Sequence, residues 1–193
     1  MKETSKAIAR RLADPLFMRA TRGHGIDIGA GTDPLNANGE FGADCIVDAF
    51  DRKDGDANRL DKCVVNESYD FIYSSHCLEH MDSWKIALRA WLRVLKWFGY
   101  GVIMVPDFDL YEQRQWPSKW AGGGHRWAFT LGKPELDVPE LIPVLPMLYS
   151  GASFITPISI RLCDAGYRYD LHDIDQSAFA ETGIEIIFQK TGQ

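Results

Sequence analysis

The sequence has few cysteines and no pair of them in a C-x-x-C spacing. Its four cysteines, Cys45, Cys63, Cys77 and Cys163, stand alone in apolar or strand-like segments. A zinc ribbon or a disulfide framework needs closely or regularly spaced cysteines, so the sequence indicates neither. We expect four reduced, buried thiols in a reducing compartment.

Long apolar runs are also absent. No run approaches the roughly 20 residues that a membrane-spanning helix requires, and the first residues lack the apolar stretch of a secretory signal peptide. The chain has no internal repeat and no low-complexity segment. The sequence therefore predicts a cytoplasmic protein that does not contact a membrane.

Positive charge is in the minority. The chain has 21 Lys and Arg against 27 Asp and Glu, which gives a formal net charge of −6. Nonspecific binding to nucleic acid usually requires a basic face, so we expect no nucleic-acid partner. Six basic residues near the N-terminus could form a local basic patch, although the solvated face of a helix is the simpler interpretation: Lys2, Lys6, Arg10, Arg11, Arg19 and Arg22.

Apolar residues are present in the proportion of a globular protein. Hydrophobic residues make up 46% of the 193 residues and aromatic residues 12%. This is enough for a packed core without crosslinks. The length corresponds to a single domain over residues 1–193, and nothing in the sequence indicates an oligomeric state.

Strand and helix signals alternate over the first hundred residues. A helix is predicted at 4–13, and a second at 82–96, where apolar residues recur on one face and Asp82 is the expected N-cap. Apolar or β-branched runs predict four strands, at 24–28, 44–47, 69–74 and 100–105. This alternation predicts an α/β fold with a doubly wound, mainly parallel sheet.

The second half of the chain is less regular. Residues 107–150 hold three tryptophans, five prolines and a run of three glycines, which indicates an insertion rather than a second domain. Thr156-Pro157 predicts the start of a helix that stops at Gly166. Two last strands are predicted, at 167–174 and 184–189.

The sharpest local pattern is GIDIGAGTDPL, at residues 25–35. Asp27 lies in a predicted strand, and Gly29 and Gly31 then form a tight turn. Glycine allows a sharp bend and a close approach to a ligand because it has no Cβ. Asp48, about twenty residues later, is predicted to close the next strand, where an acid accepts hydrogen bonds from ribose hydroxyls. The pattern predicts an adenosine-containing ligand.

Two ligands of this kind remain possible. A dinucleotide needs a small third loop residue and a helix N-terminus facing its pyrophosphate. The sequence has Asp33-Pro34 at that position, and a carboxylate would repel a pyrophosphate. Asp27 suits a cationic ligand instead. S-adenosylmethionine (SAM) carries an ammonium and a sulfonium group, so SAM is favoured over a nicotinamide dinucleotide.

Taken together, the motifs resemble those of class I SAM-dependent methyltransferases, in a short branch of the methyltransferase-11 type. The resemblance covers roughly residues 20–107 and is carried by GIDIGAGTDPL, CIVDAFD, GDANRL, YDFIYSSHCLEHM and LRVLKWFGYGVIMVPD. It implies a Rossmann-like sheet of the seven-stranded type. The sheet would be shortened after its second strand, because eight positions between Asp48 and Asp56 are too few for a helix and a third strand.

The resemblance also implies a set of cofactor-binding residues. They would be Asp27, Gly29, Ala30 and Gly31 at the methionine end of SAM, Asp48 at the ribose, and Asp56 with Ala57 at the adenine. The loop beside the departing methyl group would consist of Ser74, Ser75 and His76.

Methyl transfer to an alcohol requires removal of a proton, so a base is expected near the methyl group. The catalytic candidates are His76, against a structural hydrogen bond, and His125, against an ordinary surface loop. For Glu79 and His80, hydrogen bonds that fix the loop are favoured over chemistry. His-x-x-Glu-His could suggest a metal site in another setting, but no metal is expected here.

The sequence thus predicts a SAM-dependent methyltransferase with a small-molecule acceptor, and O-methylation of a sugar or similar metabolite is favoured. Residues 107–150 are expected to cover the acceptor site. Two alternatives stay open, a non-catalytic SAM-binding module and a nicotinamide-dependent oxidoreductase.

Overall fold

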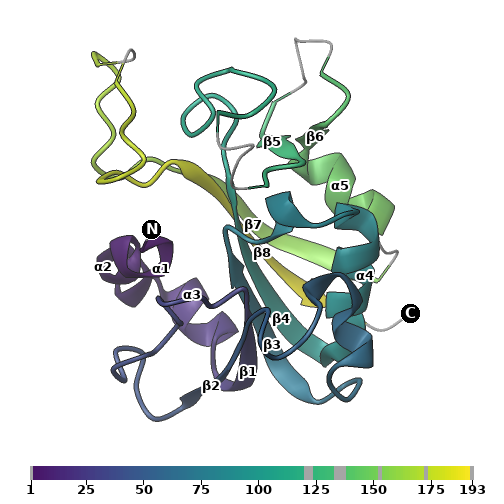
Figure 1. Cartoon of the computed structure of the whole chain (residues 1–193). Helices are drawn as coiled ribbons and strands as arrows, with labels where there is room; N and C mark the ends of the chain where they lie inside the picture. Colours follow the sequence, from purple (N-terminus) through teal and green to yellow (C-terminus); the bar gives the residue numbers. More distant parts are fainter. Residues whose placement is uncertain (1, 120–123, 133–137, 152–153, 172–173, 192–193) are drawn as a thin grey trace.

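A six-stranded sheet forms the centre of the molecule (Figure 1). The computed structural model describes residues 2–119, 124–132, 138–151, 154–171 and 174–191. The strand order is β2-β1-β3-β4-β8-β7, in which the first four strands are parallel and β8 is antiparallel to both neighbours. The strands are β1 (Gly23–Ile28), β2 (Cys45–Phe50), β3 (Tyr69–Ser75), β4 (Leu95–Pro106), β7 (Ile155–Cys163) and β8 (Gly183–Lys190). The predicted mainly parallel α/β sheet is confirmed.

Helices cover both faces of this sheet (Figure 1). One face carries the three N-terminal helices α1 (Glu3–Lys6), α2 (Ile8–Leu12) and α3 (Pro15–Ala20). The other face carries η1 (Ala57–Lys62), α4 (Trp84–Val94) and α5 (Val144–Gly151), and the short turn η2 (Leu78–His80) joins β3 to α4. η1 follows β2 where a longer fold would have a helix and a further strand, as the spacing predicts.

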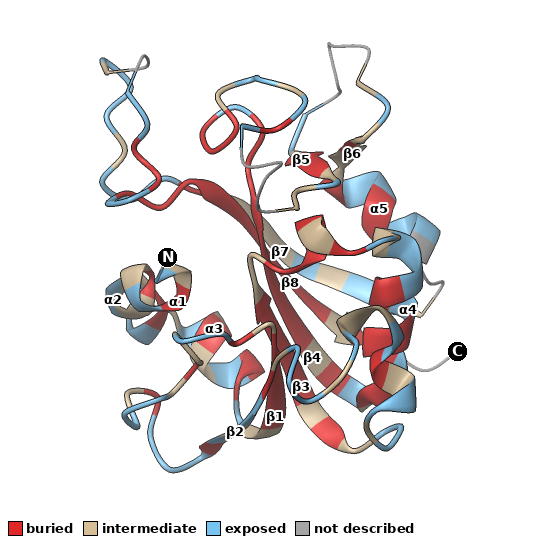
Figure 2. Cartoon of the chain, viewed as in Figure 1, coloured by how far each residue is buried: buried red, intermediate tan, exposed pale blue. Residues whose placement is uncertain are grey.

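The alternation of side chains along β3 builds a core on each side of the sheet. Phe71 and Tyr73 are buried with Phe17 of α3, and the rings of Phe17 and Tyr73 lie 6.4 Å apart. Ile72 points the opposite way and is buried with Trp91 of α4. The strand therefore has no solvent-facing side, and Figure 2 shows the central strands largely buried.

Helix α4 confirms its predicted apolar face but not its predicted cap. Leu88, Trp91 and Leu92 are all buried. Ser83, rather than Asp82, is the N-cap, and its hydroxyl accepts a hydrogen bond from the backbone N–H of Ile86 at 3.4 Å. Asp82 is used elsewhere, because its carboxylate lies 3.0 Å from Arg126.

Two of the N-terminal arginines form neither a basic patch nor a solvated face. Arg10 and Arg11 reach Glu185 near the start of β8, at 2.8 and 3.0 Å, and Arg11 and Glu185 are fully buried. Burial alone would raise the pKa of Glu185, but the charge of Arg11, with Arg10 and Arg161, lowers it to about 2. These ion pairs fix the N-terminal helices against the sheet.

The predictions for residues 156–174 are wrong. Thr156 and Pro157 lie in β7, not at a helix start. A proline fits there because β7 is an edge strand and its pairing with β8 shifts register between Pro157 and Ser159. The described residues of 167–174 form turns instead of a strand, and Gln176 accepts a hydrogen bond from the backbone N–H of Arg168 at 2.7 Å. Residues 172–173 of this predicted strand lie outside the described part.

Residues 107–150 are an irregular insertion, with a two-stranded sheet of β5 (Ala128–Thr130) and β6 (Leu141–Pro143) followed by α5. Trp120 and two of the three glycines lie outside the described residues. No helix in the described part of the chain has the length and apolar character to cross a bilayer. Cys45, Cys77 and Cys163 are buried free thiols as predicted, whereas Cys63 is exposed.

Candidate active site

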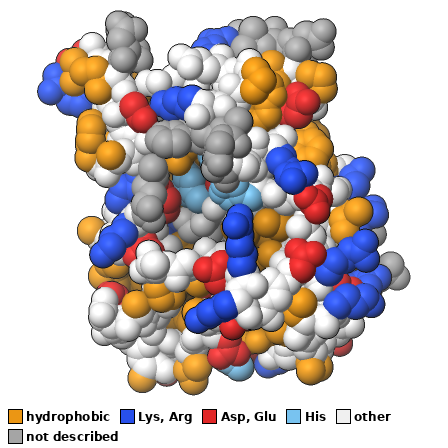
Figure 3. Space-filling view, viewed as in Figure 1, with side chains coloured by type: hydrophobic (Ala, Val, Ile, Leu, Met, Phe, Trp, Pro, Cys, Tyr) orange, Lys and Arg blue, Asp and Glu red, His pale blue; other side chains and the backbone are white. Residues whose placement is uncertain are grey.

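Two adjoining cavities lie at the carboxyl ends of β1, β2 and β3. We call the first the histidine cavity; it has a volume of about 230 Å³ and is lined by Glu3, Thr4, Asp27, Gly29, Ala30, Gly31, Thr32, Asp33, Ser75, His76, Glu79, His80, Tyr111 and His125. Figure 3 shows histidine side chains near the centre of this face, with acidic side chains beside them.

The second is the loop cavity, of about 380 Å³, formed mainly by residues that follow β2 and β3. Its lining consists of Gly29, Phe50, Asp51, Arg52, Gly55, Asp56, Ala57, Asn58, His76, Cys77, His80, Met81, Asp82 and Arg126. The two cavities share Gly29, His76 and His80. Together they reach the size of a small-molecule site, roughly 300–1,000 Å³.

The glycine loop after β1 lies between the cavities. Gly29 has φ +81°, and a Cβ there would lie 2.7 Å from Sγ of Cys77, so the position excludes any side chain. Gly31 has φ +54°, but the nearest atom to its hypothetical Cβ is 4.0 Å away. Gly29 is thus required by packing, whereas Gly31 leaves open space on the cavity side.

Asp27 lies near the end of β1 and is 1% exposed. Its carboxylate accepts a hydrogen bond from the backbone N–H of Leu35 at 2.8 Å, which ties the strand to the end of the glycine loop. Burial raises the pKa of Asp27 to about 7, because the hydrogen bond from Leu35 and the charge of Arg11 offset only part of the loss of water. A positively charged ligand group in the histidine cavity would stabilise its ionised form.

The acid at the end of the second strand is not Asp48. That prediction is wrong because β2 continues to Phe50, two residues beyond Asp48. Asp48 instead contacts His24 and Tyr69, at 2.9 and 3.1 Å, and lines neither of the two cavities. Asp51, the first residue after the strand, lines the loop cavity.

The next predicted pair, Asp56 and Ala57, lines the loop cavity. Asp56 caps η1 by accepting a hydrogen bond from the backbone N–H of Asn58 at 2.9 Å. The carbonyl of Ala57 accepts one from the indole N–H of Trp91 at 2.9 Å, so α4 holds this short turn in place.

The two serines at the end of β3 have different surroundings. Ser75 lines the histidine cavity. Ser74 lines neither cavity; it is buried inside the sheet, and its hydroxyl donates a hydrogen bond to the carbonyl of Ile28 at 2.9 Å. Of the predicted serine contacts, only Ser75 can face a ligand.

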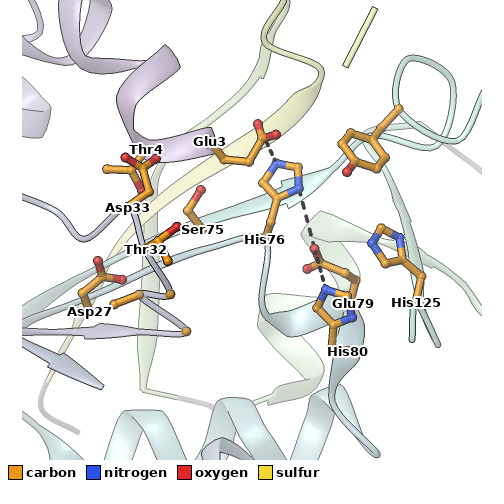
Figure 4. Close-up of a pocket in the computed structure, with 14 residues that line it drawn as sticks. Glu3, Thr4, Asp27, Thr32, Asp33, Ser75, His76, Glu79, His80 and His125 are labelled. Atoms are coloured by element: carbon orange, nitrogen blue, oxygen red, sulfur yellow. Dashed lines mark ion pairs between the residues drawn. The ribbon is translucent and has the colours of Figure 1, made fainter. Parts of the chain in front are cut away.

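His76 lines both cavities from the turn after β3, where its φ is +53° (Figure 4). The ring lies between two carboxylates, with Nε2 3.6 Å from Glu3 and Nδ1 3.6 Å from Glu79. Within the described residues neither ring nitrogen has a hydrogen-bond partner. Burial, with the positive charges of Lys6 and other neighbours, holds the pKa of His76 well below its ordinary value, so the ring is neutral.

His125 reaches the histidine cavity from the insertion. Its Nδ1 lies 2.7 Å from Oε1 of Glu112, and its ring stacks against Tyr111 at 5.7 Å between centroids. The backbone N–H groups of Arg126 and Trp127 both donate to the carbonyl of Glu79, at 2.8 and 3.2 Å. The insertion is therefore fastened to η2, and His125 is brought next to Glu79.

Several cavity residues were not predicted from sequence. Glu3 and Thr4 belong to α1, which is held over the glycine loop because Ser5 donates its backbone N–H to Asp33 at 2.9 Å. Tyr111 comes from the insertion. These contacts join segments far apart in the sequence, and no local pattern marks them. Asp51 could have been found from the sequence, because it is the second acid in CIVDAFD. Choosing between the two acids requires knowing where the strand ends.

Comparison with known proteins identifies the class. The sequence matches the family model described as "Methyltransferase domain" over residues 2–133. The chain therefore belongs to the methyltransferase domain family, and the predicted activity class, methyl transfer from SAM, is confirmed. The match gives no support to the nicotinamide-dependent alternative. No curated protein matches the sequence.

Solved structures agree on the fold. The chain is similar to a Burkholderia thailandensis 1,6-didemethyltoxoflavin-N1-methyltransferase solved with S-adenosylhomocysteine, with a TM-score of 0.58, 16% identity and coverage of 96% of this chain and 79% of that one. An Archaeoglobus fulgidus SAM-dependent methyltransferase has a TM-score of 0.53, 15% identity and coverage of 98% and 95%. The chain is also similar to a chain in a Haloferax volcanii complex of the Trm112 methyltransferase activator with a methyltransferase. The TM-score is 0.57 and the identity 12%, with coverage of 99% of this chain and 91% of that one.

Proposed function

We propose that this chain transfers the methyl group of SAM to a hydroxyl oxygen of a small polar acceptor, such as a sugar or a similar metabolite. The observation that supports this most directly is the position of His76, whose neutral ring borders both cavities. In this proposal the adenosine occupies the loop cavity beside Asp51 and Asp56. The methionine end passes the glycine loop toward Asp27, whose carboxylate favours a cation.

The chemistry needs one proton acceptor. The acceptor oxygen attacks the methyl carbon in line with the carbon–sulfur bond, the bond electrons leave with the sulfur, and S-adenosylhomocysteine (SAH) is formed. The hydroxyl proton passes to a free nitrogen of His76, which is unprotonated at neutral pH because its pKa is low. His76 follows β3 and lines both cavities, which supports this role.

The lining of the histidine cavity supports a hydrophilic acceptor. Thr32 and Ser75 contribute hydroxyl groups, and most of the remaining side chains are acids or histidines. An apolar acceptor would leave these groups without water or hydrogen bonds, at a cost of roughly 1–3 kcal/mol each. Tyr111 and His125 line the same cavity from residues 107–150, in keeping with an insertion that covers the acceptor.

A panel of acceptors tests this proposal. SAH formation is measured with sugars and polyols and, separately, with amines of similar size. We expect turnover with hydroxyl compounds, and a loss in His76→Ala of roughly 100-fold or more in kcat. The control is His24→Ala, which removes an exposed histidine paired with Asp48. Turnover with amines alone, or undiminished turnover in His76→Ala, would sink the proposal.

A further inference from the structure

Three side chains beside the cofactor cavities converge on one point. Glu79, His80 and His125 each offer a ligand atom, and these atoms lie within 4.8 Å of one another. Glu79 and His80 come from η2, and His125 comes from the insertion that η2 holds by two backbone hydrogen bonds. The cluster therefore joins two segments that are far apart in the sequence, since His80 and His125 are separated by 45 positions.

The carboxylate of Glu79 is the unusual member. Its side chain is 0% exposed, and neither of its oxygens has a hydrogen-bond partner among the described residues. The nearest ring nitrogens belong to two histidines, with Nδ1 of His76 at 3.6 Å and Nε2 of His80 at 3.8 Å (Figure 4). Burial, with the negative charges of Glu112 and Glu3, raises the pKa of Glu79 to about 8. A buried carboxylate with no bonded donor is costly unless a cation is bound.

His125 is oriented as a metal-binding histidine would be. Glu112 is buried and lies 2.7 Å from Nδ1 of His125, so this carboxylate favours the tautomer with its proton on Nδ1. Nε2 then carries the free lone pair. Histidine ligands of metals almost always donate their second ring nitrogen to a carboxylate, a carbonyl or water in this way.

We propose that Glu79, His80 and His125 bind one divalent transition-metal ion at the wall of the histidine cavity. Two imidazoles and one carboxylate suit ions such as zinc better than magnesium, which prefers oxygen ligands and water. A tetrahedral ion with bonds of about 2.0–2.1 Å needs ligand atoms about 3.3 Å apart. The observed spread of up to 4.8 Å must therefore close by about 1.5 Å when the ion binds.

Three protein ligands leave a coordination position open, as in catalytic rather than structural sites. The role of the metal rests on the proposed function: the acceptor hydroxyl takes the open position, and coordination lowers its pKa. His76, 3.6 Å from Glu79 and not among the three ligands, accepts the released proton. The metal thus prepares the oxygen that attacks the methyl carbon.

Cobalt binding tests the site without any turnover. The full chain is stripped with a chelator and titrated with Co²⁺, whose visible absorption reports tetrahedral coordination by nitrogen and oxygen. We expect one equivalent to bind, and Glu79→Gln and His125→Ala to lose roughly 100-fold or more in affinity. His24→Ala, which removes a histidine that pairs with a carboxylate outside both cavities, is expected to bind Co²⁺ normally.

Failure of the metal site and failure of the proposed function give different results. SAH binding to the stripped protein is measured in parallel, and circular dichroism confirms that each variant is folded. Absence of stoichiometric Co²⁺ binding to the wild type, or equal binding by Glu79→Gln and the wild type, overturns the metal site whether or not SAH binds. If His125→Ala is unfolded, the Glu79→Gln titration decides the question.

Discussion

The carboxylate of Glu112 contacts Nδ1 of His125 and orients its imidazole ring. One carboxylate oxygen lies 2.7 Å from Nδ1 of His125, and the other accepts a hydrogen bond from the hydroxyl of Ser118 at 2.6 Å. Glu112 is fully buried, so these contacts are shielded from water. The pair fixes the orientation of the His125 ring and favours the tautomer with its proton on Nδ1, which makes Glu112 a positioning residue.

Two replacements of Glu112 distinguish its role in orienting His125 from its role in filling space. We expect Glu112→Ala to weaken Co²⁺ binding by about 10–100-fold, because His125 loses its orientation. Glu112→Gln keeps an oxygen that accepts from Nδ1 and is expected to retain most of the affinity. Equal losses in both variants would contradict the positioning role, and the Co²⁺ titration measures the difference.

Asp51 and Asp48 form a matched pair for cofactor binding. We expect Asp51→Ala to weaken SAH binding by about 10–100-fold, because a carboxylate that bonds ribose hydroxyls contributes roughly 1.5–3 kcal/mol. Asp48→Ala is expected to leave the affinity unchanged, since Asp48 contacts His24 and Tyr69 outside the cavities. Calorimetric titration of both variants checks this, and a larger effect in Asp48→Ala would refute the assignment.

The two glycines of the loop should respond differently to alanine. Gly29→Ala places a methyl group 2.7 Å from Sγ of Cys77 at φ +81°, so we expect a loss of about 2–4 kcal/mol in the free energy of unfolding. Gly31→Ala meets no atom closer than 4.0 Å and should cost about 1 kcal/mol, yet weaken SAH binding by narrowing the cavity. Urea unfolding and SAH titration of each variant measure the contrast. A Gly29→Ala protein as stable as the wild type would show that the loop packs otherwise.

The buried Asp27 makes stability depend on pH. Its pKa is raised to about 7 by burial, whereas in the unfolded chain it is about 3.9. The contribution of Asp27 to the free energy of unfolding is thus fully present below pH 4 and is lost as the pH rises through 7. Above that pH the folded protein must bury a charged carboxylate.

Without ligand at pH 8, we expect the free energy of unfolding of Asp27→Asn to be higher than that of the wild type by on the order of 2–4 kcal/mol. The gap should close toward pH 4. The same variant should bind SAH more weakly at pH 8, because the cationic end of the ligand loses its carboxylate. Urea titrations across this pH range measure the gap, and Asp44→Asn, at an exposed ion pair with Arg22, is the control. A wild type more stable than Asp27→Asn at pH 8 would contradict the burial argument.

The sequence alone predicted the parts of the fold that local patterns determine. β1, β3, β4 and the apolar face of α4 follow from runs and periods of apolar residues, and the glycine loop follows from its spacing. Positions that depend on distant partners were wrong. Thr156-Pro157 resembles a helix start and so predicts a helix, whereas pairing with β8 makes that segment the strand β7.

The same distinction between local patterns and distant partners applies to the candidate site. Asp27, Gly29, Gly31, Asp56 and His76 line the cavities as expected. Asp48 was misplaced because the end of β2 is set by its pairing with β1, which continues to Ile28 and Phe50. For Glu79 and His80 the sequence favours local hydrogen bonds, because the third member of the cluster, His125, comes from an insertion with no pattern of its own.

A crystal structure of the complex with SAH is the most direct test of the site. The account predicts the adenosine in the loop cavity, with its ribose hydroxyls on Asp51, and the sulfur at the border of the histidine cavity facing His76. SAH bound elsewhere, or with its ribose on Asp48 and its sulfur turned away from His76, would contradict it.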